Sequence, residues 1–366
     1  MSNKLSVKYR FPLMLIGFVS LLFGSYIGLY RLGFSFPLSV EQVGLHGPLM
    51  ICGFLGTLIC LERAVAIGQI WAYGGALSSA VGSLLLMFGI NWYLGVTLIL
   101  LASVVLKVAS IRILFQECEW FSFVLMLGSF SWFVGCLLWL GGLPFIQIIP
   151  WWVGFLVLTI AGERLELSRF LKPSKTSKKA FIATIFLLVI GLISSTLINI
   201  GSFQFLSFAL ALLALWFLRN DVVRQTIKQH GLTRYIAIAL GTGYLWLLVA
   251  ALIGLFVPII KSGYNYDAFM HAIFIGFGFS MIFGHALIIF PAILKVKIPF
   301  NESFYTPLII LHLSLILRVY GDFSYLQGLR RLGGMFNIIS IILFILTMIS
   351  ALLLDKRKQA FSKISP

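Results

Sequence analysis

Two histidines, His46 and His271, stand at the beginning of long apolar segments and carry the clearest chemical signal in the sequence. The first begins the motif HGPLM (residues 46–50), and the second ends the motif AFMH (residues 268–271). A polar, metal-binding side chain is costly in lipid, so it usually marks a functional site. Neutral imidazole is a common metal ligand, and the pair is therefore a candidate for holding haem iron inside a membrane.

Membrane helices are the elements that must position these histidines. The chain has 366 residues, of which 60% are hydrophobic and 10% charged, and its mean hydropathy is +1.05. Apolar stretches near 20 residues recur along it, each long enough to cross a bilayer as a helix. We predict one all-α, polytopic domain (residues 1–366) in the lipid bilayer, with twelve spans at 11–31, 43–66, 71–90, 93–114, 121–141, 149–170, 180–199, 203–219, 234–258, 267–291, 303–321 and 330–354.

The net charge of +16 follows from membrane topology rather than from nucleic-acid binding. Lys and Arg gather at the N-terminus, after spans six and eight, and in the C-terminal tail, which all lie on one side of a twelve-span protein. The positive-inside rule then places both termini in the cytoplasm and the chain in the inner membrane. Arg330 and Arg331, between spans eleven and twelve, are the exception on the outer side.

Spans two and ten both run inward in this topology, so His46 and His271 lie at a similar outer depth. A low-spin b-type haem needs two such imidazoles, an apolar slot for the ring and cations for its propionates. Each feature also has a plainer explanation as a helix-to-helix hydrogen bond, a packing point or a headgroup anchor. The glycines that would let a flat ring approach the helices are Gly44, Gly47, Gly53 and Gly276.

These segments resemble subunit I of the haem-copper oxidases and the related NnrS-type membrane proteins. The second helix of that family carries His-Gly-x-x-Met, which residues 46–50 match, and its His binds the low-spin haem. The tenth helix carries Ala-His-Phe-His with a Phe-Pro about twenty residues later; Ala268, His271 and residues 290–291 match that spacing. The family's outer Arg-Arg pair binds the haem propionates and resembles residues 330–331, and Arg31 stands where the family has an Arg near the haem.

The departures from this family remove its catalytic centre. Phe269 occupies the position of the high-spin haem ligand, and spans six and seven contain no histidine for copper. The tyrosine of helix six and the lysine of helix eight are also missing. The resemblance therefore implies one low-spin haem b and no binuclear copper centre, which excludes ordinary terminal oxidase or nitric oxide reductase activity. The implied iron ligands are His46 and His271, surrounded by Arg31, Gly47, Met50, Arg330 and Arg331.

A second set of polar residues lies toward the other ends of the same spans. Span two ends with Leu-Glu-Arg (61–63), and span six ends with Gly-Glu-Arg (162–164). With a rise of about 1.5 Å per residue, these Glu-Arg pairs lie at one depth near the inner surface, together with His285 of span ten. Such groups relay protons, hold a quinone carbonyl or bind a metal, whereas Glu–Arg pairs also satisfy one another at helix ends. The set is Glu62, Arg63, Glu163, Arg164 and His285.

Three functions are compatible with these patterns. The resemblance implies a membrane b-type cytochrome for electron transfer or for a response to nitric oxide or redox state, and a coordinatively saturated bis-His iron suits electron transfer. The second is a quinol-linked oxidoreductase that uses the haem and the inner polar residues, with quinone or a redox protein as partner. The third is a transporter or haem-handling protein, although the inverted repeats of many transporters are not evident. Whether the chain is an enzyme stays open.

Overall fold

Twelve membrane-length helices make up the fold of the described residues. The computed structural model describes residues 5–171, 174–197, 202–257 and 263–362, and the regular structure in these ranges is entirely helical. The predicted all-α fold with twelve spans is therefore confirmed. The helices long and apolar enough to cross a membrane are Val7–Arg31, His46–Ile67, Ile70–Met87, Trp92–Glu117, Trp120–Leu140, Phe145–Ser168, Lys175–Leu197, Phe203–Asn220, Gly231–Phe256, Tyr264–Leu294, Glu302–Phe323 and Gln327–Asp355.

The chain divides into two compact units. The first comprises residues 1–170 and 185–202, and the second comprises residues 171–184 and 203–366. Helix α9 (Lys175–Leu197) contributes to both. The chain ends that the topology prediction assigns to the cytoplasm, residues 1–4 and 363–366, lie outside the described residues.

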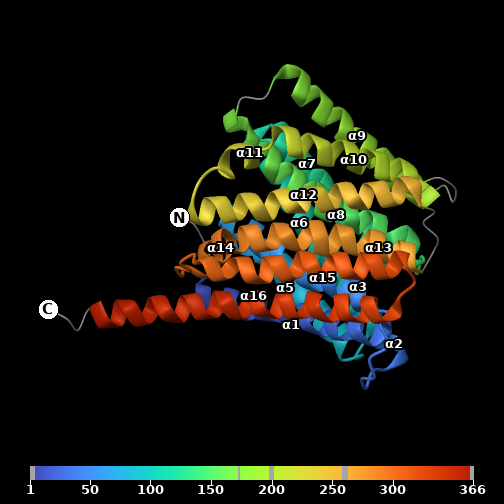
Figure 1. Ribbon diagram of the computed structural model, residues 1–366, viewed down its shortest axis with the longest axis horizontal. Coiled ribbons are helices and arrows are strands. Elements are labelled where there is room, and N and C mark those ends of the chain that lie inside the picture. Colours follow the sequence, from blue (N-terminus) through green and yellow to red (C-terminus); the bar gives the residue numbers. More distant parts are fainter. Residues whose placement is uncertain (1–4, 172–173, 198–201, 258–262, 363–366) are drawn as a thin grey trace. The chain divides into compact units, whose positions relative to one another are not determined.

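The first unit is built from antiparallel neighbours in chain order (Figure 1). Its α5, α6, α7 and α8 pack each against the next. Glycine allows this close approach: Gly56 lies against the ring of Trp132, which itself stacks on Phe155 with ring centroids 4.9 Å apart. The elements are α1 (Val7–Arg31), α2 (Val40–Val43), α3 (His46–Pro48), η1 (Leu49–Gly56), α4 (Thr57–Ile67), η2 (Ile70–Ala72), α5 (Tyr73–Met87), α6 (Trp92–Glu117), α7 (Trp120–Leu140) and α8 (Phe145–Ser168).

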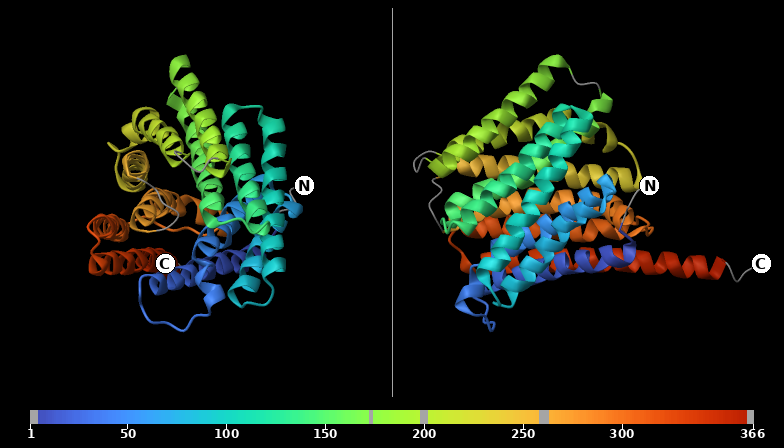
Figure 2. Two further views of the ribbon diagram at one scale, coloured as in Figure 1. Left: turned by 90° about the vertical axis from the view of Figure 1, so that its right-hand side faces the viewer. Right: turned by 180° about the vertical axis from the view of Figure 1, so that it is seen from behind.

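In the second unit one span is an interrupted helix made of α13, η4 and α14, and it lies beside the continuous helices α12, α15 and α16. Its α12 packs against η4 and α14, and α15 packs along α16, as the orange and red helices of Figure 2 show. Gly321 and Gly333 make the α15–α16 approach tight, because a Cβ at either position would meet the opposing backbone at 2.7–2.8 Å. The elements are α10 (Ser202–Asn220), α11 (Val223–Thr226), α12 (Gly231–Phe256), α13 (Tyr264–His271), η4 (Ala272–Phe279), α14 (Ser280–Leu294), η5 (Glu302–Phe304), α15 (Tyr305–Phe323) and α16 (Gln327–Ser362).

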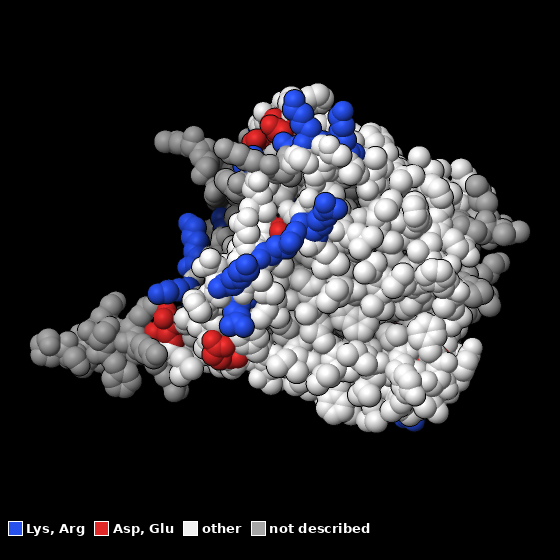
Figure 3. Space-filling model, turned by 45° about the horizontal axis from the view of Figure 1, so that its top comes forward, with Lys and Arg blue, Asp and Glu red and all other residues white. Residues whose placement is uncertain are grey.

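Large apolar side chains also cover much of the outer surface, as expected for helices that contact lipid. Exposed examples along the spans include Leu22, Leu101, Leu245 and Leu313. On the face shown in Figure 3, Lys and Arg gather toward one side, and the broad area beside them carries almost no charge. The chain is thus a multi-pass membrane protein.

Candidate functional site

His46 lies at the first turn of its span and is held against helix α1. Its Nδ1 donates a hydrogen bond to the carbonyl oxygen of Gly24 at 2.7 Å. The ring also rests on Gly28, where a Cβ would lie 2.9 Å from Cε1 of the histidine. Because a carbonyl can only accept, Nδ1 carries a hydrogen, and in a neutral ring Nε2 would then be the nitrogen able to bind a metal.

Gly28 should therefore be required for this position of the imidazole. We expect Gly28→Ala to displace the His46 ring and break its bond to Gly24, with a cost of about 1 kcal/mol in the free energy of unfolding. Thermal unfolding in detergent measures this loss. Gly74→Ala is the matched control, since a Cβ at Gly74 has nothing within 4 Å; equal effects of the two changes would contradict the close packing at Gly28.

His271 ends helix α13 and has the same tautomer. Its Nδ1 donates to the carbonyl oxygen of Asp267, one turn earlier, at 2.8 Å. The same nitrogen lies 3.3 Å from Oδ1 of the Asp267 side chain. A neutral histidine held in this way by Nδ1 is the form that binds a metal through Nε2.

A π-helix follows each of these histidines. In the first unit η1 spans Leu49–Gly56, and in the second unit η4 spans Ala272–Phe279, immediately after His271. π-Helical turns are rare and occur frequently at functional sites. Their eight-residue length in both places sets these two spans apart from the other ten in the described parts of the chain.

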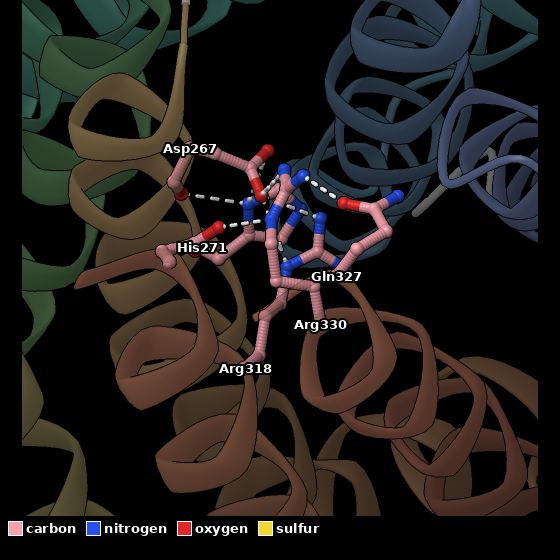
Figure 4. Close-up of polar contacts among 6 residues, drawn as sticks. Asp267, His271, Arg318, Gln327 and Arg330 are labelled. Atoms are coloured by element: carbon pink, nitrogen blue, oxygen red, sulfur yellow. Dashed lines mark hydrogen bonds and ion pairs between the residues drawn. The ribbon is translucent and has the colours of Figure 1, made fainter. Parts of the chain in front are cut away.

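A network of buried charges surrounds Asp267 in the second unit (Figure 4). Oδ2 of Asp267 accepts from Nη2 of Arg318 at 2.8 Å and lies 3.3 Å from Nη2 of Arg330. Arg330 in turn donates to Asp322 and, at 2.8 Å, to Gln327. Arg318 and Asp322 are 7% and 1% exposed, so these charges are removed from solvent and must compensate one another.

Sequence reasoning missed Asp267, Arg318 and Asp322. A local signal existed for each. Asp267 precedes His271 by four residues, and Asp322 follows Arg318 by four, so each pair shares one helix face. Charged residues inside apolar spans are uncommon and functional by default.

The predicted propionate ligand Arg330 is already engaged by the protein. Its guanidinium contacts the carboxylates of Asp267 and Asp322 and lies 4.2 Å from the ring centre of Tyr264. The neighbouring Arg331 is half-buried. A propionate at Arg330 would therefore have to share this cation with two carboxylates.

The other residues predicted around a haem differ in their surroundings. Arg31 is exposed in the last turn of α1, and Gly47 has open space beside it. The Met50 sulfur lies 4.0 Å from the Ser25 hydroxyl. A Cβ added at Gly44 would have no contact shorter than 3.8 Å.

Two of the glycines predicted to admit a flat ring do not do so. A Cβ at Gly53 would meet Ser83 and Ser20, and one at Gly276 would meet the Trp246 side chain. Both glycines serve helix packing inside their own units, because the space beside them is filled by side chains. The prediction for these two residues was wrong, since spacing along a helix does not reveal what lies opposite it.

The inner polar residues of the first unit do come together. Glu62 on α4 lies within range of the charge of Glu163 on α8, and Arg63 interacts with both carboxylates. Arg164 also acts on Glu163 and is only 3% exposed. His285, on α14 of the second unit, donates from Nδ1 to the carbonyl oxygen of Met281 at 2.8 Å. Among the described residues no group of three or more His, Cys, Asp or Glu side chains is placed to hold a metal ion.

One family model matches residues 10–353, a range that includes both histidines and the Asp267 network, and its description is "Domain of unknown function (DUF8744)". The chain belongs to this family. No curated protein and no solved structure matches the chain. Within the matched range each unit carries one imidazole whose Nδ1 donates to a backbone carbonyl, and a π-helix follows that histidine in each unit.

Proposed function

We propose that this protein is a membrane b-type cytochrome with one low-spin haem b, whose iron is bound by His46 and His271. The observation that carries the proposal is the shared orientation of the two rings: each Nδ1 donates to a backbone carbonyl, the arrangement in which a histidine binds a metal through Nε2. Two ligands are sufficient for a haem iron, since the porphyrin supplies the other four.

The apolar, π-helical segments after both histidines support this assignment. Residues of η1 and η4 are almost all buried, which suits the low-dielectric surroundings of a b-type haem. Phe269, at the position of the second haem ligand in the oxidases, packs on Phe203 with ring centroids 6.0 Å apart and is fully buried. We therefore propose a single haem without a second iron or copper centre.

Electron transfer is the proposed role of this haem, with an inner-membrane location and both termini in the cytoplasm. A bis-His iron has no open position, so a response to nitric oxide would require one imidazole to leave. Arg31, Gly47, Met50, Arg330 and Arg331 are the proposed surroundings of the ring. Optical spectra of the purified protein, oxidised and reduced with dithionite, test the proposal. A folded protein that contains no haem would contradict the assignment as a b-type cytochrome.

A second candidate, a quinol-linked oxidoreductase, is favoured by the Glu62–Glu163 group. Neither carboxylate forms a hydrogen bond or an ion pair within 4 Å in the described residues. Both carboxylates interact electrostatically with Arg63, and Glu62 also interacts with Glu163. Carboxylates in this state accept protons from a bound quinol. His285 would belong to the same function.

Glu163→Gln should then slow the reduction of the haem by a quinol analogue by at least about tenfold, because the proton acceptor is removed. Glu62→Gln should do the same, and dithionite should still reduce both variants. Stopped-flow absorbance measures the rates. Glu117→Gln, at an exposed position at the end of α6, is the control. Unchanged rates in both test variants would exclude the quinol-linked function and leave electron transfer as the proposed role.

A further inference from the structure

We propose that Asp267 is a positioning residue for His271, and that its carboxylate lowers the reduction potential of the bound iron. The inference rests on the proposed haem site and concerns the regulation of its redox state. It is carried by the contacts of Asp267 within the second unit, which link the imidazole to a set of buried charges (Figure 4).

Asp267 supplies two acceptors to one imidazole nitrogen. The two residues lie one turn apart on α13, so the backbone carbonyl of Asp267 reaches Nδ1 of His271 at 2.8 Å. Oδ1 of the side chain approaches the same nitrogen to 3.3 Å. The ring is therefore oriented by its own helix, and its Nδ1 hydrogen faces a negative charge.

The two carboxylate oxygens have separate roles. Oδ1 faces His271, while Oδ2 accepts from Nη2 and Nε of Arg318 at 2.8 and 3.3 Å and lies 3.3 Å from Nη2 of Arg330. These two guanidinium groups fix the orientation of the Asp267 carboxylate. Asp322 pairs with Arg330, so two carboxylates and two guanidinium groups balance in charge.

A fixed carboxylate beside Nδ1 increases the electron donation of a histidine ligand to its metal. It also places a negative charge near the iron, in surroundings where charges are weakly screened. Both effects favour the ferric over the ferrous state. The network therefore sets a lower reduction potential than a histidine bonded to a neutral acceptor would give.

Spectroelectrochemical titration of the purified haem protein tests this inference in wild type and in Asp267→Asn. We expect the midpoint potential of the variant to rise by at least about 59 mV, equivalent to a tenfold change in the ferric-to-ferrous ratio for one electron. Asp322→Asn is the matched control, because Asp322 bonds to Arg330 and not to His271 in the described residues. Its shift should be clearly smaller.

The outcomes separate the two proposals. Equal shifts in both variants, or none in Asp267→Asn while the wild type holds a His271-dependent haem, would overturn the role of Asp267 alone. Absence of haem from the folded wild type would overturn the proposed function and this inference with it. If Asp267→Asn fails to fold, Asp267→Glu decides: it keeps the charge but moves the carboxylate, so an unchanged potential and spectrum would refute positioning.

Discussion

Replacing His46 or His271 by alanine is expected to abolish the sharp low-spin absorption bands of the reduced protein. Each change removes one axial nitrogen, so the iron becomes high-spin or the haem is lost altogether. The effect should be complete in both variants, since a single remaining imidazole cannot give a low-spin bis-His site. Optical and electron paramagnetic resonance spectra of the purified variants measure it.

Two other histidines serve as controls for this prediction. His230→Ala changes an exposed residue that precedes α12, and His285→Ala changes a ring whose Nδ1 is also bonded to a carbonyl. Both variants should keep the wild-type spectrum. If His285→Ala lost the spectrum and His271→Ala kept it, His285 rather than His271 would be the iron ligand in this span.

Replacing Arg318 by methionine is expected to cost about 3 kcal/mol in the free energy of unfolding. The Arg318 side chain is buried and donates to Asp267 through two nitrogens, so its loss leaves a half-buried carboxylate with only part of its compensation. A methionine fills a similar volume, which separates the loss of charge from the loss of packing. Thermal or denaturant unfolding in detergent, followed by helical circular dichroism, measures the cost.

The double variant Asp267→Asn/Arg318→Met should recover part of this loss, because it removes the anion together with its cation. Arg234→Met is the exposed control near the start of α12 and should change stability by less than about 0.5 kcal/mol. If Arg318→Met and Arg234→Met were equally mild, the Asp267 network would not contribute to stability.

Hydropathy and spacing were sufficient to predict the twelve helices. Each span is an apolar run long enough to cross a bilayer, and in lipid such a run can satisfy its backbone only as a helix. The positions of His46 and His271 at the beginnings of two spans follow from the same local information. The similar placement of Glu62 toward the end of one span and of Glu163 toward the end of another follows from it too.

The partners of these side chains depended on tertiary structure. The bond from His46 to Gly24 joins residues 22 positions apart, and the ion pair of Arg318 with Asp267 joins residues 51 apart. No periodicity within one helix encodes which helix lies opposite, so Gly53 and Gly276 were assigned to a ring although side chains fill the space beside them. The π-helical turns were equally invisible, because the same apolar residues suit either helical form.

The sequence by itself therefore determined the helices, their number and the histidines that they carry, since these depend on local hydrophobicity and on residue type. Tertiary structure alone decided the tautomer of each histidine and the charge network around Asp267, since a buried polar group takes its state from the atoms that packing brings to it.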